Sequence, residues 1–120
     1  MSKYADVYLL PIPEENIPAY KKLATAAGKL FMKHGALRYR EYVASDLNVQ
    51  DVVPFPKRIK LKPGETLVYA AVEFKSEAHR NKVMKALFAD PELGAGMEGH
   101  KPPFDYKRMV YGGFKVLVDL

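Results

Sequence analysis

The stretch TLVYAAVEF (66–74) gives the clearest strand signal in the sequence. It is rich in β-branched and aromatic residues, and the turn residues Pro63-Gly64 stand just before it. Ser76, a residue typical of helix N-termini, follows almost at once, with the acidic Glu77 behind it. The stretch therefore predicts a strand that passes directly into a helix.

Two further strands and a helix are predicted on its N-terminal side. YADVYLLPI (4–12) and ALRYREYVA (36–44) both read as strands. Apolar residues recur at helical spacing between them, so we expect a helix over 16–34. Asn16 can cap its free N–H groups, and Gly35 is a natural residue to end it.

The segment 46–65 is predicted to be a long connection, because three prolines interrupt it. Its piece RIKLK (58–62) alternates apolar and basic residues, which suggests a short edge strand or a hairpin arm. The densest basic cluster, Lys57, Arg58, Lys60 and Lys62, also lies here. A solvated loop is the favoured interpretation of that cluster, and an anion contact is the alternative.

The C-terminal third predicts one helix and one strand. The helix starts at Ser76 and ends at Asp90-Pro91, and a loop rich in glycine and proline follows over 91–105. The apolar stripe of this helix consists of Val83, Met84, Leu87 and Phe88. The strand spans 108–118, and Gly112-Gly113 inside it suggests a bulge or a close backbone approach.

The resulting order, strand–helix–strand–strand–helix–strand, is the ferredoxin-like βαββαβ pattern of the α+β class. It predicts a four-stranded antiparallel sheet with both helices on one face. We expect Tyr8, Tyr69 and Tyr111 on the other face. Because such an aromatic face is seldom left in water, it should meet a second copy, a ligand or nucleic acid.

Composition favours one globular domain over 1–120. The 120 residues are 48% hydrophobic and 28% charged, and the net charge of +5 is spread along the chain. The absence of cysteine excludes disulfides, thiolate metal sites and cysteine nucleophiles. With no signal-peptide pattern and no long apolar run, we expect a cytoplasmic protein without a membrane partner.

Three stretches resemble the YbaA-like family of small bacterial proteins, a domain of unknown function. They are GALRYREYVASD (35–46), DPELGAG (90–96) and PFDYKRMVYGGF (103–114). The resemblance implies a dimeric α+β barrel, in which two ferredoxin-like sheets face each other and enclose a pocket, but it implies no reaction. The positions that match the family pattern are Asp6, Glu41, Asp46, Asp90, Phe104, Asp105, Arg108, Tyr111, Gly112, Gly113 and Phe114.

Carboxylates on apolar strand faces are the candidate catalytic groups. Glu41 and Glu73 are costly to bury without a partner, so they could be acid–base groups with Arg108 or Arg38 as the charge partner. A structural salt bridge is the alternative, and it is favoured. Asp6 shares a face with Tyr8, which could polarise a carbonyl or simply pack in a core.

The predicted substrate-binding residues are Tyr8, Tyr39, Tyr69, Arg108 and Tyr111. His34, His79 and His100 lack the spacing of metal ligands, so neither a metal nor a cofactor is predicted. GAGMEG (94–99) matches a dinucleotide fingerprint only literally, because it follows a helix rather than a strand.

Three functions compete at this point. The first is a small-molecule enzyme or binder that uses a pocket between the sheets of a homodimer. The second is a structural or regulatory dimer without a ligand. The third, an RNA-binding module, is disfavoured because the strand 66–74 carries Glu73 and no arginine, so no nucleic-acid partner is expected.

Overall fold

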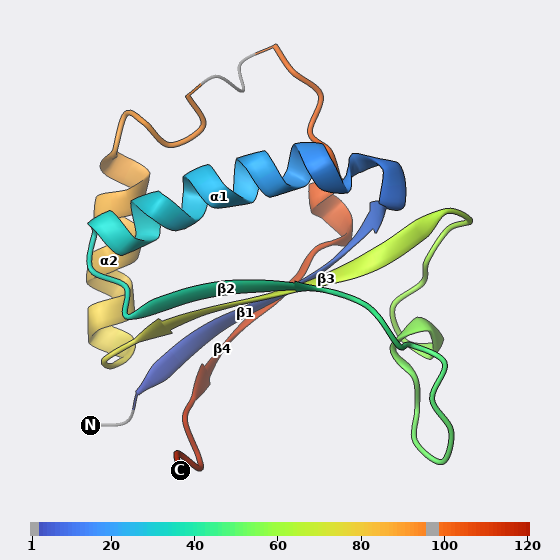
Figure 1. Ribbon diagram of the computed structural model, residues 1–120. Coiled ribbons are helices and arrows are strands. Elements are labelled where there is room, and N and C mark those ends of the chain that lie inside the picture. The colour runs from blue at the N-terminus through green and yellow to red at the C-terminus, as the bar shows by residue number, and fades with distance from the viewer. Residues whose placement is uncertain (1–2, 96–98) are drawn as a thin grey trace.

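A computed structural model describes residues 3–95 and 99–120, and it has the predicted βαββαβ order (Figure 1). Residues 96–98 of the GAGMEG stretch lie outside the described residues. The strands are β1 (Tyr4–Pro13), β2 (Arg38–Val43), β3 (Glu65–Phe74) and β4 (Val110–Lys115). The helices are α1 (Ile17–Lys33) and α2 (Glu77–Ala89).

The four strands form one antiparallel sheet in the order β2-β3-β1-β4. This arrangement confirms the predicted ferredoxin-like fold. β1 is central and pairs with β3 along its whole length, but β4 pairs with it only as far as Leu9. Pro11 and Pro13, which have no N–H to donate, therefore lie where β1 has a neighbour on one side alone.

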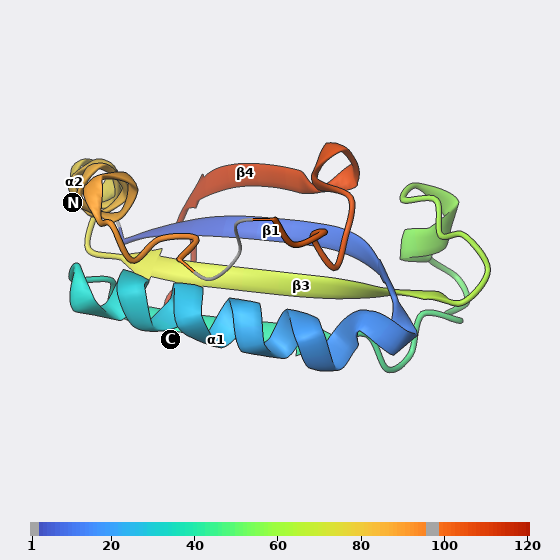
Figure 2. The same cartoon turned by 90° about the horizontal axis from the view of Figure 1, so that it is seen from above.

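Both helices lie on the same side of the sheet (Figure 1). α1 runs along the half of the sheet that contains β2 and β3, whereas α2 stands at one end (Figure 2). Ser76 caps α2 as predicted, because its hydroxyl accepts the His79 N–H at 3.1 Å. The capping role predicted for Asn16 is wrong: its amide nitrogen donates to the Pro103 carbonyl at 2.8 Å, which ties the start of α1 to the loop before β4.

Two apolar clusters fill the space between the helices and the sheet. One lies at the α2 end and includes Phe31, Phe74 and Val83. The other lies near the start of α1 and includes Ile12 and Phe104. Neither cluster fills the space above the middle of the sheet.

Three local predictions are corrected by the structure. No strand forms over 58–62, and the nearest regular element is a 3₁₀ turn at Phe55–Lys57. β4 keeps an unbroken register with β1 through Gly112 and Gly113, so there is no bulge. Phe88 is 70% exposed and does not belong to the buried stripe of α2.

The prediction that Tyr8, Tyr69 and Tyr111 share the helix-free face is wrong for two of them. Tyr8 and Tyr111 are paired in the β1–β4 register and lie on the helix side, whereas Tyr69 lies on the helix-free side. The physical reason lies in the face of Tyr8, which includes Asp6. This face also carries Leu10 and Ile12, whose burial favours packing against the helices, and an arginine from α2 pairs there with the Asp6 carboxylate.

Candidate functional site

A cavity of about 430 Å³ lies between α1, the centre of the sheet and the loop that precedes β4. Its walls are mainly apolar, with contributions from Leu10, Leu23, Phe31, Met84, Leu87 and Phe104. Its polar side chains come chiefly from the sheet and from α1. They are Tyr8, Tyr20, Tyr39 and Glu41, with His100 and Tyr106 on the loop.

Small residues create this space. Ala24 and Ala27 of α1 line the cavity, and so does Ala70 in the middle of β3. Ala70 stands between the buried Val68 and Val72, which lie on the same face of the strand. Since alanine ends at Cβ, the helix and the sheet do not fill the space between them at this level.

Glu41 is the one carboxylate among the described residues that line the cavity. The Tyr20 hydroxyl donates to its Oε1, and the Tyr39 hydroxyl donates to its Oε2. Tyr20 comes from α1, so the contact joins the helix to the edge strand β2. The Tyr39 ring lies so close to Gly28 that a Cβ added there would come within 2.7 Å of it, and this close approach holds the ring in place.

Both tyrosines are held in the protonated form. Burial raises the pKa of Tyr20 and of Tyr39, and in each case the hydrogen bond to Glu41 raises it further. Burial likewise raises the pKa of Tyr8, and the nearby Asp6 charge adds to the effect. The two phenols therefore act as hydrogen-bond donors that fix the Glu41 carboxylate, whose remaining lone pairs can accept from a ligand.

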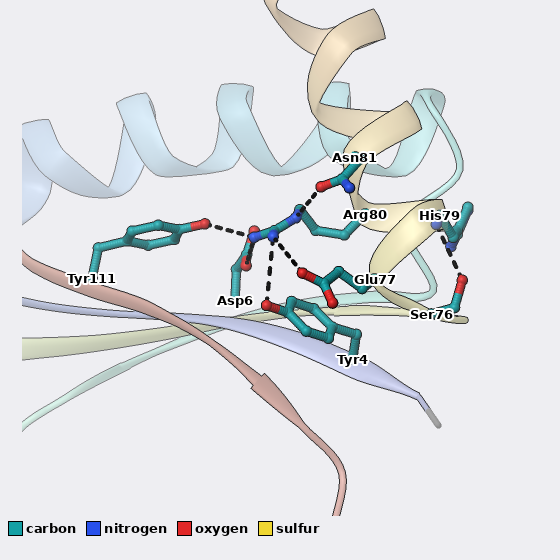
Figure 3. A network of polar contacts seen from close by, with 8 residues as sticks. All are labelled: Tyr4, Asp6, Ser76, Glu77, His79, Arg80, Asn81 and Tyr111. Atoms are coloured by element: carbon teal, nitrogen blue, oxygen red, sulfur yellow. Dashed lines mark hydrogen bonds and ion pairs between the residues drawn. The ribbon is translucent and has the colours of Figure 1, made fainter. Parts of the chain in front are cut away.

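A second polar cluster surrounds Asp6, next to the α2 end of the sheet (Figure 3). Arg80 of α2 donates to Asp6 Oδ1 at 2.7 Å and to the Tyr111 hydroxyl at 2.9 Å. Its guanidinium also lies over the Tyr4 ring, 4.8 Å from the ring centre. The cluster therefore fastens α2 to β1 and β4.

Asp6 is fully buried, and its Oδ2 has no hydrogen-bond partner within the described residues. Burial raises the pKa of this carboxyl, although the attraction of Arg80 opposes the shift. The Tyr8 and Tyr111 rings, 4.8 Å apart, connect the cluster to the cavity. Asp6 itself does not line the cavity, so its predicted role beside a substrate has no direct contact to support it.

The other predicted site residues lie away from the cavity. Glu73 pairs in register with Arg38 on the helix-free face, so Glu41 and Glu73 lie on opposite faces of the sheet. Arg108 makes a two-pronged ion pair with Glu65, with N–O distances of 2.6 and 2.8 Å. Arg108 also donates to the Lys60 carbonyl, so it holds the start of β3 and the connection before it.

The histidines play three different parts. His34 contacts Asp90 at 2.7 Å beyond the end of α1, and His79 accepts the Lys75 N–H at the start of α2. His100 borders the cavity. Within residues 3–95 and 99–120, no three His, Asp or Glu side chains are grouped closely enough to hold a metal ion.

Sequence reasoning missed Tyr20 and Arg80. Tyr20 falls at the apolar spacing of the first helix, yet a buried tyrosine hydroxyl needs a partner, and that requirement could have indicated a carboxylate on the sheet. Arg80 had no local signal. The buried Asp6 carboxylate requires a cation beside it, but the sequence does not indicate which residue provides that cation.

The fold and cavity define a small ferredoxin-like α+β protein with a tyrosine-bound carboxylate inside it. The chain belongs to the family described as "Protein of unknown function (DUF1428)", whose model matches residues 3–106. It is 34% identical over 117 residues to the uncharacterized protein YbaA of Escherichia coli K12, and the match covers 98% of each chain. The predicted resemblance to the YbaA-like family is thereby confirmed.

Solved structures support the fold. A dimeric ferredoxin-like protein from an uncultured marine organism matches with a TM-score of 0.58 at 13% identity over all of both chains. A dimeric ferredoxin-like protein of unknown function from Thermobifida fusca matches with a TM-score of 0.51 at 14% identity, over 96% of this chain and 92% of that one. Among the described residues, no helix is long and apolar enough to cross a membrane.

Proposed function

We propose that the cavity binds a small, largely apolar molecule that carries one hydrogen-bond donor, such as a hydroxyl or an amine. The observation that supports this proposal is the position of Glu41, an otherwise costly carboxylate at the wall of an apolar space. An apolar body would fill the space between the alanines of α1 and β3. The donor would bind Glu41, and a ligand with an acidic proton would present that proton to the same carboxylate.

The dimensions of the cavity agree with this proposal. About 430 Å³ falls within the range of pockets that hold small ligands. The ligand site predicted from sequence lay between two sheets, on the helix-free side. The proposed site lies instead within one chain, on the helix side, so it does not require a second copy to be complete.

A thermal-shift screen of small aromatic alcohols, aromatic amines and their hydrocarbon counterparts tests the proposal. We expect compounds with a donor to raise the melting temperature of the natural protein. Ala27→Phe places a large side chain into the cavity and should abolish these shifts. If Ala27→Phe responds like the natural protein, the ligands bind elsewhere and the proposed site is wrong.

We also propose that the protein is a homodimer that pairs through the helix-free face of the sheet. Val110 and Phe114 of β4, with Tyr42 and Tyr69 of β2 and β3, leave large apolar surfaces exposed on this face. Two of the structural relatives are dimeric ferredoxin-like proteins, which is consistent with such pairing. Covering these side chains would remove their apolar surface from water.

Light scattering after size exclusion tests the homodimer. We expect twice the chain mass for the natural protein and the chain mass for Val110→Glu, because a charge buried in an apolar interface is costly. Phe88→Glu is the control: its side chain is also more than half exposed but lies on α2, on the other side of the sheet. A natural protein that runs as a monomer at micromolar concentration would contradict the proposal.

A further inference from the structure

The segment that follows β4 is an apolar extension that has few contacts with its own chain. Its sequence is VLVDL (116–120), and Leu117 is 94% exposed while Val118 is 70% exposed. Within residues 3–95 and 99–120, two polar interactions hold it: the Val116 N–H donates to the Lys3 carbonyl at 2.9 Å, and Asp119 lies 3.4 Å from the Lys3 ammonium. Large apolar side chains so close together and so exposed indicate a surface that another group covers.

An apolar groove of about 440 Å³ lies on the helix-free side, at the opposite end of the sheet. It forms where the long connection between β2 and β3 folds away from the sheet, on the side opposite the helices (Figure 1). Its main lining residues are Leu9, Tyr42, Val43, Leu47, Phe55 and Tyr69. The C-terminus projects on this same side of the sheet (Figure 1).

The segment 116–120, called the tail from here on, cannot fill the groove of its own chain. β4 runs from Val110, opposite Leu9, to Lys115, opposite Tyr4, so the tail leaves the sheet at the end away from the groove. Five extended residues span about 17 Å at 3.3 Å per residue. Running back past the six residues of β4 would use up that length before the groove was reached.

The charges near the groove and in the segment 116–120 are opposite in sign. The connection that forms the groove carries Lys57, Arg58, Lys60 and Lys62, and none of these side chains makes an ion pair within the part of the chain that is described. The tail carries Asp119 among its apolar residues. The tail and the connection that helps to form the groove therefore carry opposite charges, which favours contact between them.

We infer that the tail 116–120 of one protomer lies in this groove of a second copy. The inference rests on the homodimer proposed above and specifies what that dimer exchanges. In a two-fold pairing of helix-free faces, the tail end of one sheet can lie over the groove end of the other, and symmetry repeats the contact. Leu117 and Val118 then pack against Tyr42, Phe55 and Tyr69 of the partner.

Engineered cysteines test the exchange in a chain that has none of its own. Leu117→Cys and Phe55→Cys are made as separate variants, mixed, unfolded and refolded together, and oxidised. We expect a disulfide between the two different chains, seen as a covalent dimer on a non-reducing gel and identified by mass spectrometry. The matched control replaces Phe55→Cys with Val52→Cys, an exposed residue of the same connection that does not line the groove.

The expected result is cross-linking at least ten times faster with Phe55→Cys than with Val52→Cys. Equal rates in a protein that light scattering shows to be dimeric would overturn the exchange and leave the homodimer intact. A disulfide within one chain carrying both Leu117→Cys and Phe55→Cys would overturn it as well. A monomeric protein would overturn the exchange together with the proposed homodimer.

Discussion

Individual carboxylates in this protein are stabilised in three different ways. Glu41 accepts hydrogen bonds from two tyrosine hydroxyls at the wall of a cavity. Asp6 is fully buried against a single arginine, and burial raises its pKa. Asp90 accepts from the Glu92 N–H, His34 and Lys33 just beyond α2, and these hydrogen bonds lower its pKa. The chemical surroundings of each group therefore set its role more than its residue type does.

Asp90→Asn should destabilise the protein more at pH 5 than at pH 2.5. The pKa of Asp90 is lower in the folded state, so the unfolded state takes up the proton first as the pH falls. The stabilisation by the ionised group is complete above its ordinary pKa of about 4 and is lost as the pH falls toward the folded pKa. Urea unfolding at both pH values measures the difference between the natural protein and the variant.

Glu92→Gln is the control for this prediction, because the Glu92 side chain is exposed whereas its backbone N–H supplies the hydrogen bond to Asp90. We expect it to behave like the natural protein at both pH values. An Asp90→Asn effect of the same size at pH 5 and pH 2.5 would contradict the account.

At the scale of elements, the attachment of α2 to the sheet depends on the close packing of Tyr4 against Gly113 of β4. The Tyr4 hydroxyl lies over Gly113, where a Cβ would come within 2.1 Å of it, and the Arg80 guanidinium lies over the Tyr4 ring. A side chain at position 113 would displace the tyrosine and, with it, the arginine that joins α2 to Asp6. Gly113 thus serves close packing, and a close approach at the glycine pair is one of the two interpretations drawn from the sequence.

Gly113→Ala should lower the free energy of unfolding by about 2 kcal/mol, as overpacked sites in protein cores do. The adjacent Gly112→Ala is a matched control, because a Cβ there would meet the Phe114 ring at an ordinary 3.4 Å. We expect it to change stability by less than about 0.5 kcal/mol. Chemical denaturation compares the two variants, and equal effects would show that the strand itself, rather than Tyr4, requires glycine.

The order of the elements could be predicted from sequence, because each strand and helix has its own period and its own end signals. TLVYAAVEF became β3, and Ser76 caps α2, as expected. The helix-capping hydrogen bond predicted for Asn16 does not form, because its side chain binds the Pro103 carbonyl, 87 residues away in the chain. Local patterns contain no information about such contacts.

At the scale of the whole molecule, the sequence does not show which face of the sheet meets the helices. Both faces of β1 are largely apolar, so alternation alone does not distinguish them, and the pocket predicted between two copies included Tyr8 and Glu41. Glu41 could be selected from sequence as a costly carboxylate on an apolar strand. The cavity beside it could not, because it depends on alanines of α1 and β3 meeting across the fold.

The central claim is that Glu41 orients a ligand inside this cavity. The most direct test is calorimetric titration of 4-propylphenol and of propylbenzene, which lacks the hydroxyl, into the natural protein, Glu41→Gln and Glu73→Gln. Glu73 is the matched control because it lies on the opposite face of the same sheet. We predict that the phenol binds the natural protein and Glu73→Gln at least ten times more tightly than propylbenzene does, and that Glu41→Gln loses most of this preference, because hydrogen bonds to charged groups are about twice as strong as neutral ones. An unchanged preference in Glu41→Gln, or no binding of either compound to the natural protein, would contradict the account.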